Sequence, residues 1–114
     1  MELQRNSHQV YEIGYHIIFC TKYRHKVLVG EAETTCRNSI AETCLAYGWQ
    51  LKELEIMPDH VHMFVSAPPQ TAPAEIARTV KSISAVKIFT AHPKLKGRKF
   101  WGLSLFGVGG SVRW

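Results

Sequence analysis

The chain has 114 residues, enough for one domain with a single modest hydrophobic core. Its hydrophobic content of 46% and charged content of 20% are ordinary for a globular protein, and the sequence shows no repeat or low-complexity tract. The formal net charge of +5 indicates a polyanionic partner, most simply nucleic acid; the alternative is a basic surface that binds nothing.

The cysteines and the hydropathy pattern indicate the cellular compartment. Cys20, Cys36 and Cys44 form no CxxC pair, and an odd count without metal-ligand spacing is typical of a reducing cytosol. The sequence contains neither a signal peptide nor a run of about 18 apolar residues. We therefore expect a cytoplasmic protein with no membrane partner, in which Cys36 and Cys44 are small core residues of a helix.

The first half of the chain predicts a strand, a basic loop and a helix. Residues 11–23 carry bulky side chains on both faces, which predicts a central strand. Residues 21–26 form a basic loop with an embedded aromatic residue. Residues 31–47 read as a helix, and Gly48 fits its C-terminal end. Its apolar positions recur at spacings of four, four and three: Cys36, Ile40, Cys44 and Tyr47.

The second half predicts two strands, a helix and a last strand, which are separated by turns and loops. Pro73 suits the first turn of the helix, and a second basic loop follows the helix. In chain order these are strand 49–56, turn 57–59, strand 60–66, loop 67–72, helix 73 to about 90, basic loop 94–99 and strand 100–106. The tail 107–114 is glycine-rich and has no helical pattern.

The element order β-α-β-β-α-β predicts an α+β fold of the ferredoxin-like type over residues 1–114. In that arrangement two helices cover one face of a four-stranded antiparallel sheet. The other face is open for a ligand or for dimer contacts. RNA-recognition domains share this architecture, but their aromatic signatures are not clear in this sequence. The fold alone does not determine the function.

His60-Val61-His62 is the main candidate site. Two histidines one residue apart on a strand project from the same face, with Cα atoms roughly 6.5–7 Å apart, and can converge on one divalent ion. The alternative is a pair of ordinary surface histidines. Asp59 is interpreted as a turn residue that points to the opposite side of the strand from His60. A metal-dependent hydrolase that uses Asp59 as an extra carboxylate is a further alternative.

Several segments together resemble the IS200/IS605-type transposases, the single-tyrosine group with an HUH motif, in which U is a hydrophobic residue. The resemblance extends from about Val10 to about Gly107. The matching segments are Tyr15-His16-Ile17-Ile18-Phe19-Cys20-Thr21-Lys22-Tyr23-Arg24, Met57-Pro58-Asp59-His60-Val61-His62-Met63, Lys81-Ser82-Ile83-Ser84-Ala85 and Lys99-Phe100-Trp101-Gly102.

The resemblance implies a protein that binds hairpins in single-stranded DNA. Members of the family cut and rejoin the strand through a 5′-phosphotyrosine intermediate. The two HUH histidines, here His60 and His62, would hold a Mg²⁺ or Mn²⁺ ion that polarises the scissile phosphate. The family proteins are dimers, so the resemblance also implies a homodimer.

The chain departs from the family in its tyrosines and in its C-terminal region. In the family the nucleophilic tyrosine lies on a helix after the last strand, and a polar residue four positions later is the third metal ligand. The tyrosines of this chain are Tyr11, Tyr15, Tyr23 and Tyr47, and none matches that position. We therefore expect a truncated or altered C-terminus, weak metal binding and no cleavage, with Tyr23 as a remote substitute for the nucleophile.

The basic residues are the candidate DNA contacts. Tyr23 lies between two cations, an arrangement that suits base stacking in single-stranded DNA. For each cation the alternative is a solvated surface charge. The candidates are Lys22, Tyr23, Arg24, Lys26, Arg78, Lys81 and Lys87. A non-catalytic nucleic-acid-binding module would use the same residues without a metal. We interpret His16 as a core or sheet-face residue.

Overall fold

The computed structural model describes residues 12–98, 105–107 and 111–113. Its antiparallel sheet has the strand order β2-β3-β1-β4, so β1 is a central strand, as its two apolar faces predict. The strands are β1 (Ile13–Cys20), β2 (Gln50–Met57), β3 (His60–Ala67) and the short β4 (Ser111–Arg113). The prediction of an α+β fold with an antiparallel sheet is confirmed.

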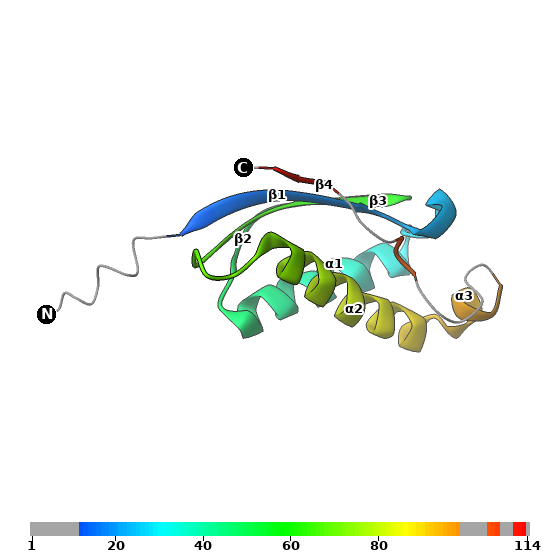
Figure 1. Ribbon diagram of the computed structural model, residues 1–114. Coiled ribbons are helices and arrows are strands. Elements are labelled where there is room, and N and C mark those ends of the chain that lie inside the picture. The colour runs from blue at the N-terminus through cyan, green and yellow to red at the C-terminus, as the bar shows by residue number, and fades with distance from the viewer. Residues whose placement is uncertain (1–11, 99–104, 108–110, 114) are drawn as a thin grey trace, which may run out of the picture.

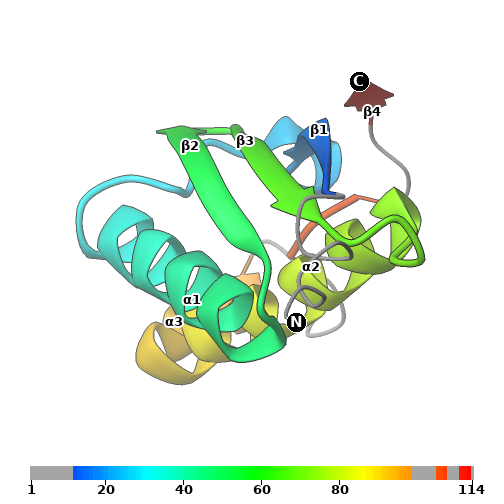
Figure 2. The same ribbon diagram turned by 90° about the vertical axis from the view of Figure 1, so that its left-hand side faces the viewer.

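The helices α1 (Glu31–Tyr47) and α2 (Pro73–Ala91) lie side by side on one face of the sheet (Figure 1). The view in Figure 2 shows the same separation into two layers. The bounds predicted for the first helix are confirmed, and Gly48 ends it with a left-handed φ of 78° that favours glycine. No helix in the described part of the chain is long and apolar enough to cross a membrane.

Three local predictions need correction. The first strand ends at Cys20, and the basic loop contains the 3-10 turn η2 (Lys22–Arg24). The second basic loop is largely helical, as α3 (Pro93–Arg98), because its backbone continues the turn that follows α2. Most of the predicted strand 100–106 lies outside the described residues. Its last residue, Phe106, makes an isolated antiparallel bridge with Thr21, and β4 comes from the glycine-rich tail.

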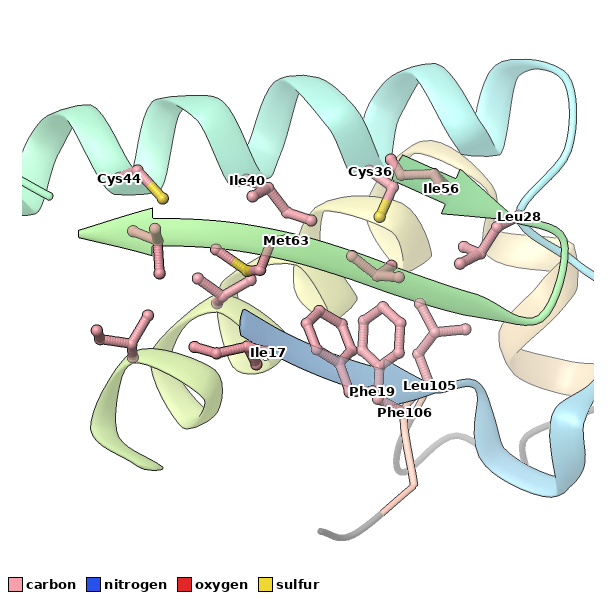
Figure 3. Close-up of a cluster of buried hydrophobic side chains, with 14 of the residues drawn as sticks. Ile17, Phe19, Leu28, Cys36, Ile40, Cys44, Ile56, Met63, Leu105 and Phe106 are labelled. Atoms are coloured by element: carbon pink, nitrogen blue, oxygen red, sulfur yellow. The ribbon is translucent and has the colours of Figure 1, made fainter. Parts of the chain in front are cut away.

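The hydrophobic core lies between the sheet and the two helices (Figure 3). Strand side chains alternate, so every second residue of β1 and β3 enters this layer. Cys36 and Cys44 face it from α1, which confirms them as core residues, and burial raises the pKa of Cys36 to about 12 and of Cys44 to about 11. The strand residues involved are Tyr15, Ile17 and Phe19 on β1 and Val61, Met63 and Val65 on β3.

Candidate functional site

The two histidines of the HUH motif lie on the sheet face opposite the helices. Val61 and Met63 are fully buried on the helix side, and the alternation of β3 therefore places His60 and His62 on the open face, where both are half-buried. Each histidine has a register partner on the central strand: Cys20 lies opposite His60, and Ile18 lies opposite His62. The predicted common face of the histidine pair is thus present in the structure.

His60 is held by the residue that precedes it. The Nδ1 atom of His60 lies 2.9 Å from Oδ1 of Asp59. The other carboxylate oxygen, Oδ2, accepts hydrogen bonds from Nε and Nη2 of Arg24, both at 3.1 Å. The hydrogen bond with His60, followed by that with Arg24, holds the pKa of Asp59 below its usual value, and the bond to Asp59 raises the pKa of Arg24.

This arrangement corrects the interpretation of Asp59. The residue does lie in the turn before β3, but its side chain contacts His60 instead of pointing to the other side. Strand alternation does not apply to Asp59, because β3 begins only at His60 and the backbone before it turns. Asp59 and His60 therefore act as one hydrogen-bonded unit.

His62 has its own neighbours on the open face. Its Nε2 atom lies 3.4 Å from Nδ1 of His16, and the ring of His16 stacks on Phe64 with centroids 4.4 Å apart. Phe64 in turn lies across Gly14, where a Cβ would come within 2.8 Å of the ring. The interpretation of His16 as a sheet-face residue is confirmed, and the structure adds that it contacts His62.

The basic turn after β1 is attached to the start of β3. The backbone N–H of Thr21 donates to the carbonyl of Asp59 at 2.9 Å, and that of Leu28 donates to the carbonyl of Pro58 at 3.0 Å. Tyr23 and Arg24 both adopt left-handed φ angles, 57° and 56°, which are uncommon for side chains of this size. The structure therefore brings the turn and the histidine strand together.

Side chains of the turn are largely available to solvent. Tyr23 is 77% exposed, and the Lys22 ammonium lies 5.6 Å from the centre of its ring, within the range of a cation–π contact. Arg24 and Lys26 are also exposed. This aromatic residue among cations has the chemistry that binds single-stranded nucleic acid.

The three remaining predicted contacts lie on α2, in the helical layer. Arg78 is exposed. Lys81 donates from Nζ to the carbonyl of Gly107 at 3.2 Å, and burial lowers its pKa. Lys87 pairs with Glu42 at 3.3 Å. The predicted DNA contacts thus come from two elements, the basic turn after β1 and the helix α2.

His60 and His62 could supply two of the ligands of a metal ion. Among the described residues, no three or more His, Cys, Asp or Glu side chains lie close enough together to hold a metal ion. Both oxygens of Asp59 are engaged in hydrogen bonds, Oδ1 with His60 and Oδ2 with Arg24.

The tyrosines differ in their access to this face. Tyr15 is buried in the core, as expected, and Tyr47 stacks on Trp49 with ring centroids 4.8 Å apart. Tyr11 lies outside the described residues. Tyr23 is exposed on the turn bonded to the start of β3.

The family described as "Transposase IS200 like" matches residues 9–109 of this sequence. The chain belongs to the IS200/IS605-type transposases. It is 39% identical over 106 residues to the ISDra2 transposase TnpA of Deinococcus radiodurans, an alignment that covers 93% of this chain and 75% of that protein.

Solved structures of transposases are similar to this one. The crystal structure of a putative transposase from Deinococcus radiodurans aligns with a TM-score of 0.83 and 36% identity, over 91% of this chain and 79% of that one. A REP-associated tyrosine transposase, solved with a REP hairpin bound, aligns with a TM-score of 0.62 and 13% identity, over 90% of this chain and 58% of that one. At that identity the second likeness concerns the fold alone.

Proposed function

We propose that this transposase-family chain binds single-stranded DNA hairpins in DNA transposition through the open sheet face and the basic turn. The observation that carries the proposal is the hydrogen-bonded chain Arg24–Asp59–His60, which joins the cationic turn to the HUH strand. Further support comes from the match of residues 9–109 to the family of IS200-like transposases. Lys22, Tyr23, Arg24 and Lys26 form the primary contact surface, and Arg78, Lys81 and Lys87 a secondary one.

His60 and His62 are the proposed ligands of a Mg²⁺ or Mn²⁺ ion. When bound, such an ion polarises a scissile phosphate and stabilises developing charge. Mg²⁺ prefers oxygen ligands in octahedral geometry, so two imidazoles bind it weakly. Mn²⁺ accepts imidazole more readily and is the better probe.

The same residues support a binding function without cleavage for the 114-residue polypeptide. A phosphotyrosine intermediate needs a tyrosine hydroxyl at the scissile phosphate. Tyr15 is buried, and Tyr47, although 54% exposed, stacks on Trp49 at the end of α1; Tyr23 is 77% exposed on the turn bonded to the start of β3 and is therefore the better placed candidate. A hairpin substrate that traps the cleaved strand, incubated with Mn²⁺, should give no covalent adduct. An adduct would refute this proposal, and its loss in Tyr23→Phe would identify the nucleophile.

The assembly, the location and the finer fold description are part of the same proposal. The strand order β2-β3-β1-β4 with helices on one face supports a ferredoxin-like arrangement. A homodimer follows from the family, and gel filtration with light scattering tests it. A cytoplasmic location accords with the three free cysteines.

Hairpin binding is tested by titration of labelled oligonucleotides with the purified chain. A hairpin with single-stranded flanks should bind more tightly than an unstructured strand or a blunt duplex of equal length. Binding should weaken as salt rises, because cationic side chains release counterions from the phosphates. Equal binding to all three DNAs would refute hairpin recognition.

A non-catalytic nucleic-acid-binding module is the second candidate function. It is favoured by the lack of a third metal ligand among the described side chains. The two candidates differ in metal dependence. Hairpin affinity that is unchanged by Mn²⁺ and by His60→Ala supports the module, and a change with both supports the metal-dependent site.

A further inference from the structure

The Asp59 carboxylate uses each of its oxygens for a different partner. Oδ1 lies 2.9 Å from Nδ1 of His60, and Oδ2 accepts both hydrogen bonds from Arg24 at 3.1 Å. The carboxylate side chain is only 17% exposed, whereas that of Arg24 is 63% exposed and that of His60 31%. Asp59 is therefore the enclosed central member of the chain.

The chemistry of the carboxylate fixes the proton on His60. An ionised carboxylate has no hydrogen to donate, so the hydrogen bond requires that Nδ1 of His60 carries the proton. In the neutral imidazole the lone pair then belongs to Nε2. A metal ion binds only a nitrogen that has a free lone pair, and a carboxylate that accepts from the other nitrogen orients the ring and increases its basicity.

We propose that Asp59 is a positioning residue, which holds His60 as the Nδ1–H tautomer with Nε2 free for a divalent ion, while Arg24 holds Asp59. This inference rests on the proposed metal-binding function of His60. It assigns to Asp59 a role different from direct ligation. The geometry favours this distinction, because both carboxylate oxygens are already engaged in hydrogen bonds with His60 and Arg24.

The backbone around Asp59 supports this role. The carbonyl of Asp59 accepts from the Thr21 N–H at 2.9 Å, and the Thr21 hydroxyl donates to the carbonyl of His25 at 2.7 Å. The neighbouring Pro58 carbonyl accepts from the Leu28 N–H at 3.0 Å. These hydrogen bonds hold the turn before β3 against the segment that follows β1. The backbone that carries the Asp59 carboxylate is therefore fixed next to His60.

The first measurement is the tautomer of His60 in the metal-free chain. Long-range ¹H–¹⁵N NMR correlations distinguish Nδ1–H from Nε2–H in a neutral imidazole. The wild-type chain should show the Nδ1–H form at His60, and Asp59→Ala should shift the population toward Nε2–H. The inference is overturned if wild-type His60 is mainly Nε2–H or if Asp59→Ala leaves the ratio unchanged.

The second measurement is Mn²⁺ affinity, from the electron paramagnetic resonance signal of free Mn²⁺. Removal of a partner of this kind costs about 10–100-fold in metal affinity, so Asp59→Ala should lie in that range. Asp59→Asn keeps an oxygen that accepts from His60, and it should lose less. If Asp59 were only a ligand, Asp59→Ala would weaken Mn²⁺ binding without changing the His60 tautomer of the metal-free chain, and that combination would refute the inference.

Glu55 offers a matched control. It is an exposed carboxylate of β2 that lies opposite His62 in the sheet register. Glu55→Gln removes the same charge from the same face and should change Mn²⁺ affinity by less than about 3-fold, since an exposed charge is screened by solvent. An equal loss in Glu55→Gln and Asp59→Ala would show that net charge, not positioning, governs affinity.

The two proposals fail in different ways. If the wild-type chain binds no Mn²⁺, or binds it equally well as His60→Ala, the proposed metal site is wrong, and the NMR measurement alone decides the role of Asp59. If His60→Ala abolishes Mn²⁺ binding while Asp59→Ala changes neither affinity nor tautomer, the metal site stands and the positioning role is wrong. Circular dichroism of each variant checks that the sheet is retained.

Discussion

The edge-to-face pair of Phe19 and Phe106 gives a quantitative prediction about how the distal segment 105–107 is held. The ring centroids lie 4.8 Å apart at an interplanar angle of 90°, and the side chains are 1% and 4% exposed. Figure 3 shows the two rings side by side in the core. Such pairs contribute about 0.5–1.5 kcal/mol beyond the area that they bury.

The perturbation is a double-mutant cycle of Phe19→Leu and Phe106→Leu. Each single substitution should lower the free energy of unfolding by about 1–3 kcal/mol, because a buried ring is replaced by a smaller side chain. The double variant should lose less than the sum of the single losses by about 1 kcal/mol, since the ring contact can be lost only once. Leucine keeps the site apolar, so the fold should survive.

Urea unfolding followed by fluorescence measures this coupling. A difference of about 1 kcal/mol moves the midpoint by roughly 0.3–1 M, from the urea dependence of small proteins. The control cycle pairs Phe19→Leu with Tyr47→Leu, whose ring contacts Trp49, and those losses should add within about 0.5 kcal/mol. Additive losses for Phe19 and Phe106 would refute the contact as an energetic link.

Three further outcomes are expected. Gly48→Ala should lower the free energy of unfolding by about 1–2 kcal/mol through backbone strain alone, because φ is +78° and nothing lies within 4 Å of the added Cβ; an unchanged denaturation midpoint would contradict this. Lys26→Ala should reduce the salt dependence of single-strand binding, the slope of log K against log salt, by about 0.7, and an unchanged slope would place Lys26 off the DNA. Burial raises the pKa of Cys36 to about 12 and of Cys44 to about 11 from 9.0, so their contribution to stability is present below pH 9.0 and is lost as pH rises through these values. In the native chain iodoacetamide should modify the half-buried Cys20 first, as peptide mass analysis would show, and equal rates would contradict the burial.

The elements that the sequence predicts well are those with local signals. Residues 31–47 have apolar side chains at helical spacing and a glycine after them, and the helix has those bounds. The strand β3 begins at His60, directly after the Pro-Asp turn, as that turn predicts. In both cases a few neighbouring residues determine the outcome.

The edge of the sheet beside β1 depends on distant pairing. Ser111, Val112 and Arg113 pair with Ile18, Ile17 and His16 of β1. A glycine-rich tail has no strand periodicity, so only the free backbone edge of β1 selects it as a strand. The short bridge between Phe106 and Thr21 also depends on pairing with a distant part of the chain. The sequence pattern predicts a whole strand, residues 100–106, in that region.

The site shows the same limit at the level of side chains. The motif places His60 and His62 on one face, because alternation is a property of any strand. It does not give the direction of the Asp59 carboxylate, which is determined by a guanidinium 35 positions earlier in the chain. That guanidinium belongs to a residue with an uncommon left-handed φ, held by a turn that is itself bonded to the start of β3. The candidate metal ligands can thus be predicted from a short motif, whereas the groups that orient them are brought into place by tertiary contacts.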